Sequence, residues 1–551
     1  MKRFFSSQWC IVIAIFLLAL GIRVISLSSL PNGFHIDEVM TGYVGRLILL
    51  TGRDIYGNHW PLWYFNTFGD YRVIAPFYIN GLSTFIFGVN IFAIRFPAAL
   101  FGALIVFPMY TISKSIFGKN YFAYVPPLLL AVLPWHIILS RATSEGIMGL
   151  TVLLTGMAFL VASIQNKKML HILVGTVLLA VTYFLYPSFR VLAPLSLIPF
   201  IFIASEKKKW YAIMLLLLLV LTYCVGNTVW GRGRFEQTSI FSGTTAQQVA
   251  ARTQGLSFAE GPSHIVLAKI FDNKAVAYSN ILLNNYLVYF SPQFLYGNER
   301  FPDRYVVPYF GLLFGALILL LTGLLLPRIK EENLSWYLAC WYFLIIAPLP
   351  GMLTADDIPN LHRVLFMMIP FVLMGTYGLK RWLSLFKRWP VARNGFIVLC
   401  VIAGLGELVF FGHAYAVQSP SYRSEARNDG YIALVSYLKQ AHENNIPLLI
   451  SAQDSVAIYY LFFTNNFDQK YAGAFKGDVK IGQIDNMTFT DMWCPSTIYA
   501  KDPYKPPVTI VEYGDCKVPS TYKIEKVIMR KDSTTAFHVL TWQGLPPGAQ
   551  N

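Results

Sequence analysis

Long apolar segments alternate with short polar ones along most of this chain. About eleven of them are long enough to cross a hydrocarbon core of ~30 Å; they lie at 9–26, 90–112, 120–139, 146–164, 170–186, 190–205, 210–229, 306–326, 335–353, 363–379 and 395–415. This pattern predicts an α-helical polytopic membrane protein. The first segment is expected to remain as a helix, because no A-x-A-like cleavage site follows it.

The connections between these segments differ in charge. Short clusters of lysine and arginine occur on one side only, at residues 2–3, 114–119, 167–168, 207–209, 328–330 and 380–388. Such clusters face the cytoplasm in membrane proteins, so the N-terminus is predicted to be cytoplasmic. The long connections 31–89 and 231–305 and the end of the chain are then extracytoplasmic.

The tail of the chain has a different pattern. From about residue 420 the charges become ordinary, and no apolar segment is long enough to span a bilayer. Short apolar runs at 446–450 and 508–511 are typical of buried strands, while 427–445 and 454–463 have helical character. We therefore predict a transmembrane domain over 1–419 and an extracytoplasmic α/β domain over 420–551.

Composition supports this division. Only 13% of the 551 residues are charged and 55% are hydrophobic, whereas soluble domains carry roughly 25% charged residues. The net charge of +15 is explained by topology and anionic lipid rather than by nucleic acid. No nucleotide-binding glycine motif occurs, and the segment Gly231-Arg232-Gly233-Arg234 lacks the framing of one.

Two cysteines lie in the tail, Cys494 and Cys516, and the others lie in apolar segments. An oxidising compartment would allow the tail pair to form a disulfide. Their sequence positions say nothing about their distance in space, so the bonded and free states both stay open.

The loop 31–89 is the densest in polar and aromatic residues. Apolar positions recur at helical intervals over 37–50, which predicts an amphipathic interfacial helix with Asp37 and Glu38 in its first turn. In one interpretation the acidic pair only favours the helix N-terminus through the helix dipole. In the other, an acidic pair at a membrane boundary carries chemistry.

Several segments together resemble a known family. They are Phe34-His35-Ile36-Asp37-Glu38, Leu50-Thr51-Gly52-Arg53-Asp54-Ile55-Tyr56-Gly57, Phe68-Gly69-Asp70-Tyr71-Arg72, Pro134-Trp135-His136, Ser140-Arg141-Ala142, Tyr186-Pro187-Ser188-Phe189-Arg190 and Leu361-His362-Arg363. They resemble bacterial integral-membrane glycosyltransferases of the GT-C superfamily, related to protein O-mannosyltransferases and lipid A aminoarabinose transferases and similar to glycosyltransferase family 39.

The resemblance implies a hexosyl- or mannosyltransferase-like enzyme of the bacterial inner membrane. Its donor would be a sugar on a polyprenyl phosphate, and its acceptor a hydroxyl of a protein, lipid or cell-envelope glycan on the extracytoplasmic face. The residue matching Asp37 serves as general base or organises the acceptor, and Glu38 would place the acceptor or hold Asp37 in position. A carboxylate can take the proton of an attacking hydroxyl, and a single direct displacement would invert the sugar.

The departing phosphate needs cationic partners. Arginine suits bidentate contact with phosphate, so Arg72, Arg141, Arg190 and Arg363 are the predicted donor phosphate-binding residues. Each also has a structural alternative. Arg72 can anchor to headgroups, Arg141 can pair with Glu145 at i+4, and the other two stand at span ends, where snorkelling to lipid is common.

Five further residues are predicted to bind substrate: His35, Asp70, Tyr71, Glu145 and His362. The chain departs from the family after Tyr71, because close relatives tend to carry Lys-Pro-Pro-Leu where this sequence has Arg72-Val73-Ile74-Ala75-Pro76. The cation is kept and the double proline is not. The sequence therefore leaves open which backbone conformation positions Arg72.

Carboxylates and histidines of these segments can also ligate a cation. The sequence has no H-E-x-x-H and no paired Cys/His spacing, so no metal site is assigned and a divalent cation is left open. Two other functions also stay open: a glycolipid transporter or flippase, and a non-catalytic envelope-assembly protein. A transporter would need charged groups deep within its spans, whereas here nearly all lie at the outer ends.

Overall fold

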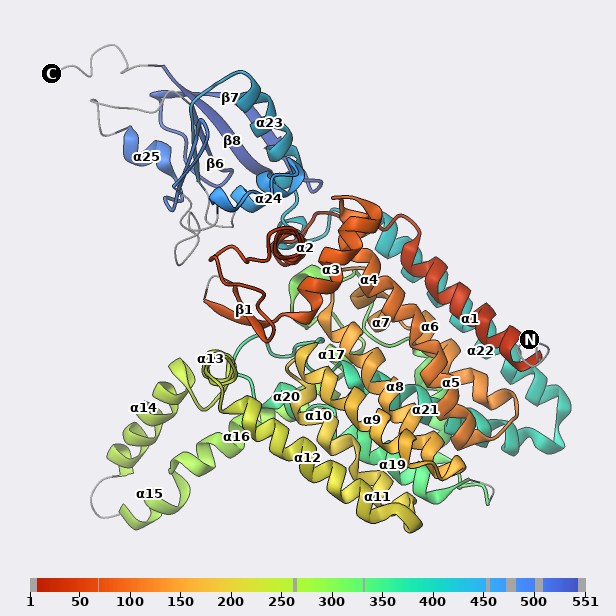
Figure 1. The fold of residues 1–551 in the computed structure, drawn as a ribbon. Coiled ribbons are helices and arrows are strands. Elements are labelled where there is room, and N and C mark those ends of the chain that lie inside the picture. Colours follow the sequence, from red (N-terminus) through yellow and green to blue (C-terminus); the bar gives the residue numbers. More distant parts are fainter. Residues whose placement is uncertain are drawn as a thin grey trace. The chain divides into compact units, whose positions relative to one another are not determined.

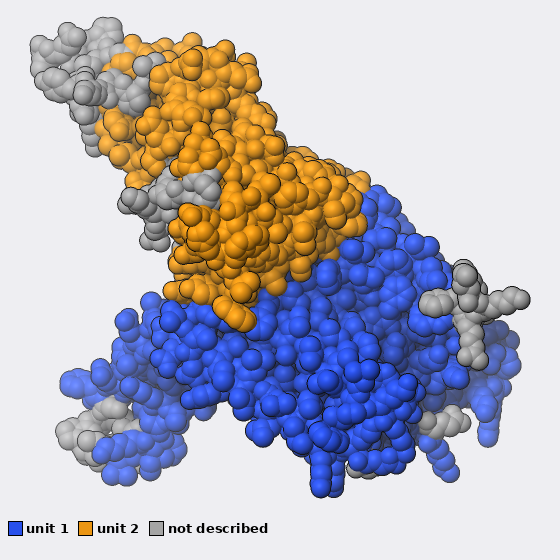
Figure 2. Space-filling view, in the orientation of Figure 1, with its two compact units in different colours: residues 1–25, 98–140, 144–413 blue, residues 26–97, 141–143, 414–551 orange. Residues whose placement is uncertain are grey.

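The computed structural model describes residues 7–67, 69–260, 265–330, 332–451, 456–471, 482–500 and 509–543. The chain forms two compact units (Figure 2). Unit 1 comprises 1–25, 98–140 and 144–413, and unit 2 comprises 26–97, 141–143 and 414–551. Unit 1 is helical, and unit 2 holds both β-sheets (Figure 1).

The helices of unit 1 are mostly apolar and connected by short loops. They are α1 (Ser7–Val24), α5 (Val106–Phe117), α6 (Val125–Val132), α7 (Pro134–Ser140), α8 (Glu145–Asn166), α9 (Met169–Val181), α10 (Phe189–Ser196), α11 (Ile198–Ile203), α12 (Lys208–Gly226), α13 (Val229–Thr238), α14 (Gly243–Glu260), α15 (Ile265–Phe271), α16 (Lys274–Leu287), α17 (Pro292–Leu295), α18 (Gly315–Thr322), α19 (Leu334–Ile346), α20 (Leu349–Met352), α21 (Met368–Leu385) and α22 (Pro390–His413). Residues of α4 (Ile91–Leu104) belong to both units.

Within the described residues, five helices are long and apolar enough to cross a membrane: Ile91–Phe117, Glu145–Asn166, Lys208–Gly226, Leu334–Met352 and Pro390–Gln418. A sixth span arises if the pair Tyr121–Val132 and Pro134–Ser140, bent by 53°, is counted as one. The bend follows from Pro134, which has no N–H to continue the helix. The polytopic helical class is thus confirmed, while the count of eleven and the orientation stay predictions.

The larger predicted count includes apolar segments that fold as shorter helices. These are Gln8–Val24, Met169–Phe184, Phe189–Ile203 and Gly315–Leu325. Pro194 lies inside α10 and Pro199 stands at the start of α11, so proline divides the apolar segment 190–205. Hydropathy alone does not locate such breaks.

Unit 2 combines the first loop with the tail. Its elements are α2 (Ile36–Thr51), α3 (Ala75–Phe87), α23 (Tyr431–Glu443), α24 (Val456–Phe463), α25 (Pro495–Tyr499), β1 (Tyr64–Thr67), β2 (Asp70–Val73), β3 (Leu448–Ser451), β4 (Gln483–Ile484), β5 (Met487–Thr490), β6 (Thr509–Tyr513), β7 (Tyr522–Met529) and β8 (Thr535–Trp542). Strands β1 and β2 form an antiparallel hairpin. The tail sheet has the order β4-β5-β3-β6-β8-β7, with β3 parallel to β5 and β6.

The α/β character predicted for the tail is confirmed. The predicted helices correspond to α23 and α24, and the predicted strands to β3 and β6. Residues 454, 455 and 508 of these predictions lie outside the described residues, as does Phe68 of the first-loop motif. The boundary at 419/420 stays a prediction, because in the structure residues 26–97 group with the tail.

Helix α2 explains this grouping. Its residues from Val39 to Ile48 are almost all buried, and they share one core with α24 and the tail sheet. Tyr459 of α24 donates a hydrogen bond to the Phe34 carbonyl at 2.6 Å. Gly45 allows α3 to approach closely, since a Cβ there would lie 2.0 Å from the Phe77 carbonyl oxygen. The helix predicted over 37–50 is therefore present, but its apolar residues pack against protein instead of lying at a lipid interface.

The structure bonds Cys494 to Cys516 across a sequence separation of 22. Closing a loop of this length removes conformational freedom from the unfolded chain and stabilises the folded state by about 3 kcal/mol. We expect dithiothreitol to lower the melting temperature of the purified full chain, measured by differential scanning fluorimetry. The Cys494→Ser/Cys516→Ser double variant should melt at the lowered temperature and not respond. An unchanged melting temperature in chain whose thiols are shown to be reduced would contradict this expectation.

Candidate functional site

The N-terminus of α2 is fixed by a reciprocal capping arrangement. His35 is the N-cap residue, and its Nδ1 accepts a hydrogen bond from the Asp37 amide at 3.1 Å. The Glu38 carboxylate accepts a hydrogen bond from the His35 amide at 3.2 Å. Two backbone N–H groups that a helix start leaves without partners are satisfied in this way. The same Nδ1 lies 3.5 Å from the Asp37 carboxylate, a contact that is an ion pair only when the imidazole is protonated.

Glu38 points into the protein and forms a buried ion pair. Its Oε1 accepts a hydrogen bond from Arg95 Nε at 2.9 Å, and its Oε2 accepts one from Arg95 Nη2 at 2.9 Å. The Thr143 amide donates a further bond at 3.1 Å. Burial acts to raise the pKa of Glu38, but the Arg95 charge and these hydrogen bonds outweigh burial, and the net effect is a lowered pKa. Glu38 is thus an ionised anchor.

Arg95 also binds the segment that precedes α2. Its guanidinium also donates to the carbonyls of Leu27 at 3.2 Å, Pro31 at 2.8 Å and Gly33 at 2.7 Å. The five donors of one arginine therefore hold both the start of α2 and the chain leading to it. Both roles predicted for Glu38, placing the acceptor or holding Asp37 in position, stay predictions.

Asp37 points to different partners from Glu38. Its side chain is 24% exposed, and its Oδ1 accepts a hydrogen bond from Arg72 Nη2 at 2.7 Å. Arg72 Nε also donates to Asp70 Oδ2 at 3.2 Å. Asp70 and Arg72 are two apart in β2, so their side chains share one face of the hairpin. The structure thus brings together His35, Asp37, Asp70 and Arg72.

The hairpin also replaces the missing double proline as the element that positions Arg72. Arg72 pairs in register with Phe65 of β1, which is buried in the core of unit 2. Pro76 instead begins α3, where its fixed φ suits the first turn. The cation is therefore held by strand pairing.

Arg141 contacts two other segments of unit 2. Its Nη2 donates to the Leu30 carbonyl at 3.2 Å, and its guanidinium lies 5.4 Å from the Tyr415 ring centre. Arg141 and Glu145 do not share a helix, because α7 ends at Ser140 and α8 begins at Glu145. The pairing of these two residues stays a prediction.

Unit 1 contains a cavity of about 330 Å³ lined by four arginines: Arg190, Arg232, Arg234 and Arg363. Hydroxyl groups of Tyr186, Ser188, Thr222, Thr238, Ser239 and Thr354 belong to the same lining. Arg363 donates to Thr354 Oγ1 at 2.7 Å and to Asp356 Oδ1 at 3.1 Å. The Arg190 guanidinium lies 4.6 Å from the Trp230 ring centre. The lining also contains one acidic residue, Glu236. Four arginines against one carboxylate leave the lining with net positive charge, which is suited to an anion such as a phosphate.

Three predicted residues surround Tyr186, which lines this cavity. The His362 ring lies 6.4 Å from the Tyr186 ring and 4.7 Å from the Tyr305 ring. Burial raises the pKa of Tyr186, while the charge of Arg363 lowers it and that of Glu145 raises it. Glu145, Arg190, His362 and Arg363 thus belong to one region of unit 1.

Tyr71 is a predicted site residue whose side chain does not lie with those of Asp70 and Arg72. It follows Asp70 and precedes Arg72, so its side chain points to the opposite face of the hairpin. There it lines a separate cavity of unit 2, about 680 Å³ in volume.

Sequence reasoning missed three residues of these sites. Arg95 lay inside an apolar segment, where an arginine is costly without a buried partner, and this cost was the available signal. Arg232 and Arg234 were noticed only as part of a glycine-containing segment without phosphate-loop framing. Their signal was basic charge on the predicted extracytoplasmic side, where lysine and arginine are scarce.

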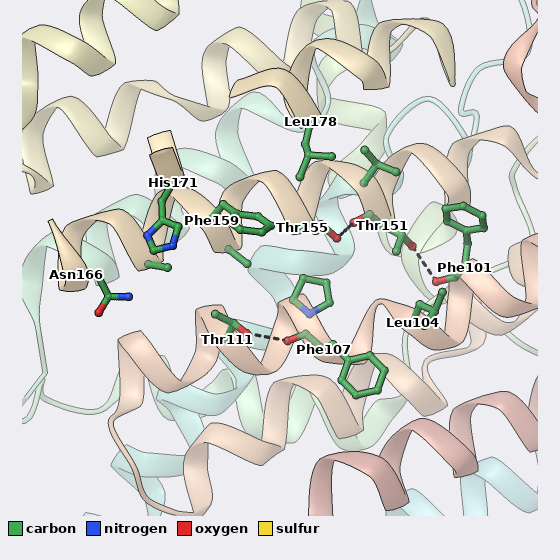
Figure 3. Close-up of a pocket in the computed structure, with 14 residues that line it drawn as sticks. Phe101, Leu104, Phe107, Thr111, Thr151, Thr155, Phe159, Asn166, His171 and Leu178 are labelled. Carbon is green, nitrogen blue, oxygen red and sulfur yellow. Dashed lines mark hydrogen bonds between the residues drawn. The ribbon is translucent and has the colours of Figure 1, made fainter. Parts of the chain in front are cut away.

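A further cavity of unit 1, about 520 Å³ in volume, is apolar (Figure 3). It lies between helices α4, α5, α8 and α9, and its threonine hydroxyls donate to backbone carbonyls, as Thr151 does to Phe101 at 2.9 Å. Among the described residues that line it, none is Arg, Lys, Asp or Glu. This cavity is suited to hydrocarbon and offers no charged group for chemistry.

No group of three or more His, Cys, Asp or Glu side chains converges in the described parts of the chain. The described residues therefore provide no ligand set for the divalent cation that the sequence left open.

The chain matches one protein-family model. Residues 72–230 match the family described as dolichyl-phosphate-mannose-protein mannosyltransferase. The match confirms the predicted resemblance to membrane glycosyltransferases of the protein O-mannosyltransferase type. The matched segment begins at Arg72, contains Arg141, Glu145 and Arg190, and does not reach Asp37.

The chain is also similar to two crystal structures of ArnT from Cupriavidus metallidurans. One is in the apo state, with 13% identity and a TM-score of 0.42, and the other is bound to undecaprenyl phosphate, with 14% identity and a TM-score of 0.45. Both comparisons cover 97% of this chain and 98% of the other chain. None of the curated proteins matches this chain.

Removing the Glu38 charge should destabilise unit 2. In Glu38→Gln the buried Arg95 loses its counter-charge, and breaking one side of a buried ion pair costs about 3–5 kcal/mol. We expect a lower melting temperature of the purified chain and faster hydrogen exchange of the α2 amides. The control Glu443→Gln, at an exposed position of the same unit, should leave both unchanged. Equal stability of the two variants would contradict the anchoring role.

The same pair predicts an acid dependence. Because the folded-state pKa of Glu38 lies below its ordinary value of 4.5, its contribution to stability is complete above pH 4.5. It is lost as the pH falls through the lowered folded-state pKa. Unfolding curves measured from pH 7 to pH 3 should therefore fall more steeply for the wild type than for Glu38→Gln. Parallel curves would contradict the lowered pKa.

Proposed function

We propose that this protein is an integral-membrane glycosyltransferase. It transfers a sugar from a polyprenyl-phosphate-linked donor to a hydroxyl acceptor on the extracytoplasmic face of a bacterial inner membrane. The observation that carries the proposal is the family match over residues 72–230, which begins at Arg72 of the hairpin and includes the cavity residue Arg190. A glycolipid transporter has no comparable observation in its favour.

Asp37 acts as the general base of this reaction. It stands at a capped helix start with its carboxylate partly exposed, while its neighbour Glu38 is fully engaged with Arg95. The Arg72 guanidinium at 2.7 Å stabilises the negative charge, so the group is ionised when the acceptor arrives. A carboxylate in this state can take the proton of the attacking hydroxyl.

Arg72 acts as a positioning residue for Asp37. Its guanidinium already contacts two carboxylates, Asp37 and Asp70, and this set carries net negative charge. Such a set is a poor site for a phosphate and a good one for holding a base in one orientation. The donor-phosphate contact predicted for Arg72 from the sequence stays a prediction.

The arginine-lined cavity of unit 1 binds the donor phosphate. Arg190 and Arg363 are the predicted residues, and Arg232 and Arg234 join them in the same lining. Cations held by structural contacts, as Arg363 is by Thr354, need little reorganisation to stabilise the charge on a departing phosphate. The transfer is a single direct displacement: the acceptor oxygen bonds to the anomeric carbon, the bond to the phosphate oxygen breaks, and the sugar inverts.

Asp37→Asn should abolish most transfer while leaving donor binding intact. The amide keeps the shape of the side chain but cannot take a proton, and losing a general base typically costs 10²–10⁴-fold in rate. The assay follows a labelled sugar from its polyprenyl phosphate to the acceptor, together with donor binding. Asp485→Asn, an exposed change in the same unit, is the control. Unaltered turnover in Asp37→Asn would remove Asp37 from the mechanism, and movement of intact labelled lipid between leaflets would favour a transporter.

Arg190→Gln and Arg363→Gln should each weaken donor binding. A hydrogen bond to a charged group contributes about 1.5–3 kcal/mol, which corresponds to roughly 10–100-fold in Kd. Because the contact is to phosphate, polyprenyl phosphate without a sugar should lose affinity by the same factor. Arg393→Gln, at an exposed position of α22, is the control. Unchanged affinity in both cavity variants would exclude this cavity as the phosphate site.

A further inference from the structure

The β1–β2 hairpin forms one wall of a polar and aromatic cavity in unit 2. The cavity has a volume of about 680 Å³, and its lining includes Tyr56, Asn58, Trp63, Tyr64, Asn66 and Tyr71. Tyr64 and Tyr71 lie side by side with ring centres 5.5 Å apart. Trp63 is 56% exposed, so a broad aromatic surface is open to solvent.

Strand geometry separates this cavity from Asp37. Tyr71 pairs in register with Asn66, and Tyr64 lies two residues before Asn66, so all three side chains share one face of the hairpin. Arg72, the partner of Asp37, is on the opposite face. A ligand in the cavity therefore contacts the reverse side of the strand that holds the base.

The loop before the hairpin gives the cavity a fixed shape. The buried Asp54 carboxylate accepts hydrogen bonds from the amides of Tyr56 and Asn58 and from the Asn58 side chain, each at 2.9 Å. Tyr78 donates to the Pro61 carbonyl at 3.0 Å, and the Gly69 amide donates to Asn66 Oδ1 at 2.8 Å. These bonds order the walls before any ligand arrives, which lowers the entropic cost of binding.

The chemistry of the lining favours an uncharged ligand. Among the described residues that line the cavity, none is Arg or Lys, and the Asp54 carboxylate is turned to the backbone. Aromatic rings offer flat faces to C–H groups, while amide side chains pair with hydroxyls. Neutral sugar rings present these two kinds of group together. A phosphate or carboxylate ligand would find no cation here.

We propose that this cavity binds a neutral sugar unit of the acceptor, and that the acceptor is a glycan of several units. The inference rests on the proposed function and specifies its acceptor class. The bound unit is not the one that reacts, because the cavity and Asp37 are on opposite faces of the hairpin. A single sugar cannot occupy both places, so a chain of sugars is required.

The first test measures binding without any donor. The full chain is purified in a detergent without a sugar headgroup, since maltoside or glucoside detergents would compete. Neutral linear pentasaccharides of glucose, mannose and N-acetylglucosamine are added, and binding is measured by saturation-transfer difference NMR and calorimetry. We expect at least one pentasaccharide to bind, and Trp63→Ala and Tyr71→Ala to weaken it at least tenfold. Trp60→Ala is the matched control, an exposed tryptophan of the same loop outside the cavity lining.

The second test separates this inference from the proposed reaction. Asp37→Asn should bind the pentasaccharide like the wild type although it does not transfer sugar. Trp63→Ala should keep its affinity for polyprenyl phosphate and lose only glycan binding. The inference is overturned if no pentasaccharide binds, if Trp60→Ala is as damaging as Trp63→Ala, or if a Ser/Thr- and Pro-rich peptide binds the cavity in place of the sugars. In each of these cases, a loss of transfer in Asp37→Asn would still support the proposed reaction.

Discussion

The buried ion pair between Glu38 and Arg95 is the constraint on which the rest of unit 2 depends. Two charges without solvent are stable only where their hydrogen bonds are complete, and here the amides of His35 and Thr143 and three backbone carbonyls complete them. The pair therefore fixes where α2 begins and how the preceding chain approaches it. No freedom remains for Asp37, the adjacent residue, to turn into the core.

The two neighbouring carboxylates, Asp37 and Glu38, consequently have different roles. Glu38 is a fixed charge whose partners are all supplied by the protein, and Asp37 is partly exposed and held by Arg72 from the hairpin. The hairpin itself has two uses, since one face carries Asp70 and Arg72 and the other carries Tyr71. The proposed base, the cation proposed to position it and the proposed sugar-binding surface thus all lie on one helix start and two short strands.

Much of this arrangement was predictable from the sequence. The apolar periodicity placed α2 and its acidic first turn, and the tail patterns placed α23, α24 and the strands β3 and β6. The disulfide between Cys494 and Cys516 was left open, because sequence spacing carries no distance. The resemblance to a glycosyltransferase family was recognisable by motif, and the family match over residues 72–230 covers Arg72 and the motif segments 134–136, 140–142 and 186–190.

The remainder depended on contacts between distant segments. Glu38 and Arg95 are 57 residues apart, and periodicity does not report such partners. The burial of α2 against α24 was likewise invisible, because an amphipathic helix suits a lipid interface and a protein core equally well. The helix boundary between Arg141 and Glu145 was also invisible, since α7 ends at Ser140 and α8 begins at Glu145.

The central claim is that one carboxylate, Asp37, takes a proton during a single displacement of phosphate by an acceptor hydroxyl. The anomeric configuration of the product tests this claim most directly. With a donor carrying ¹³C-labelled sugar, NMR coupling at the anomeric carbon compares the linkage in the donor with the linkage in the product. Inversion of configuration is the predicted result. Retention would require a double displacement or a front-face reaction, and it would contradict the single direct displacement with Asp37 as base.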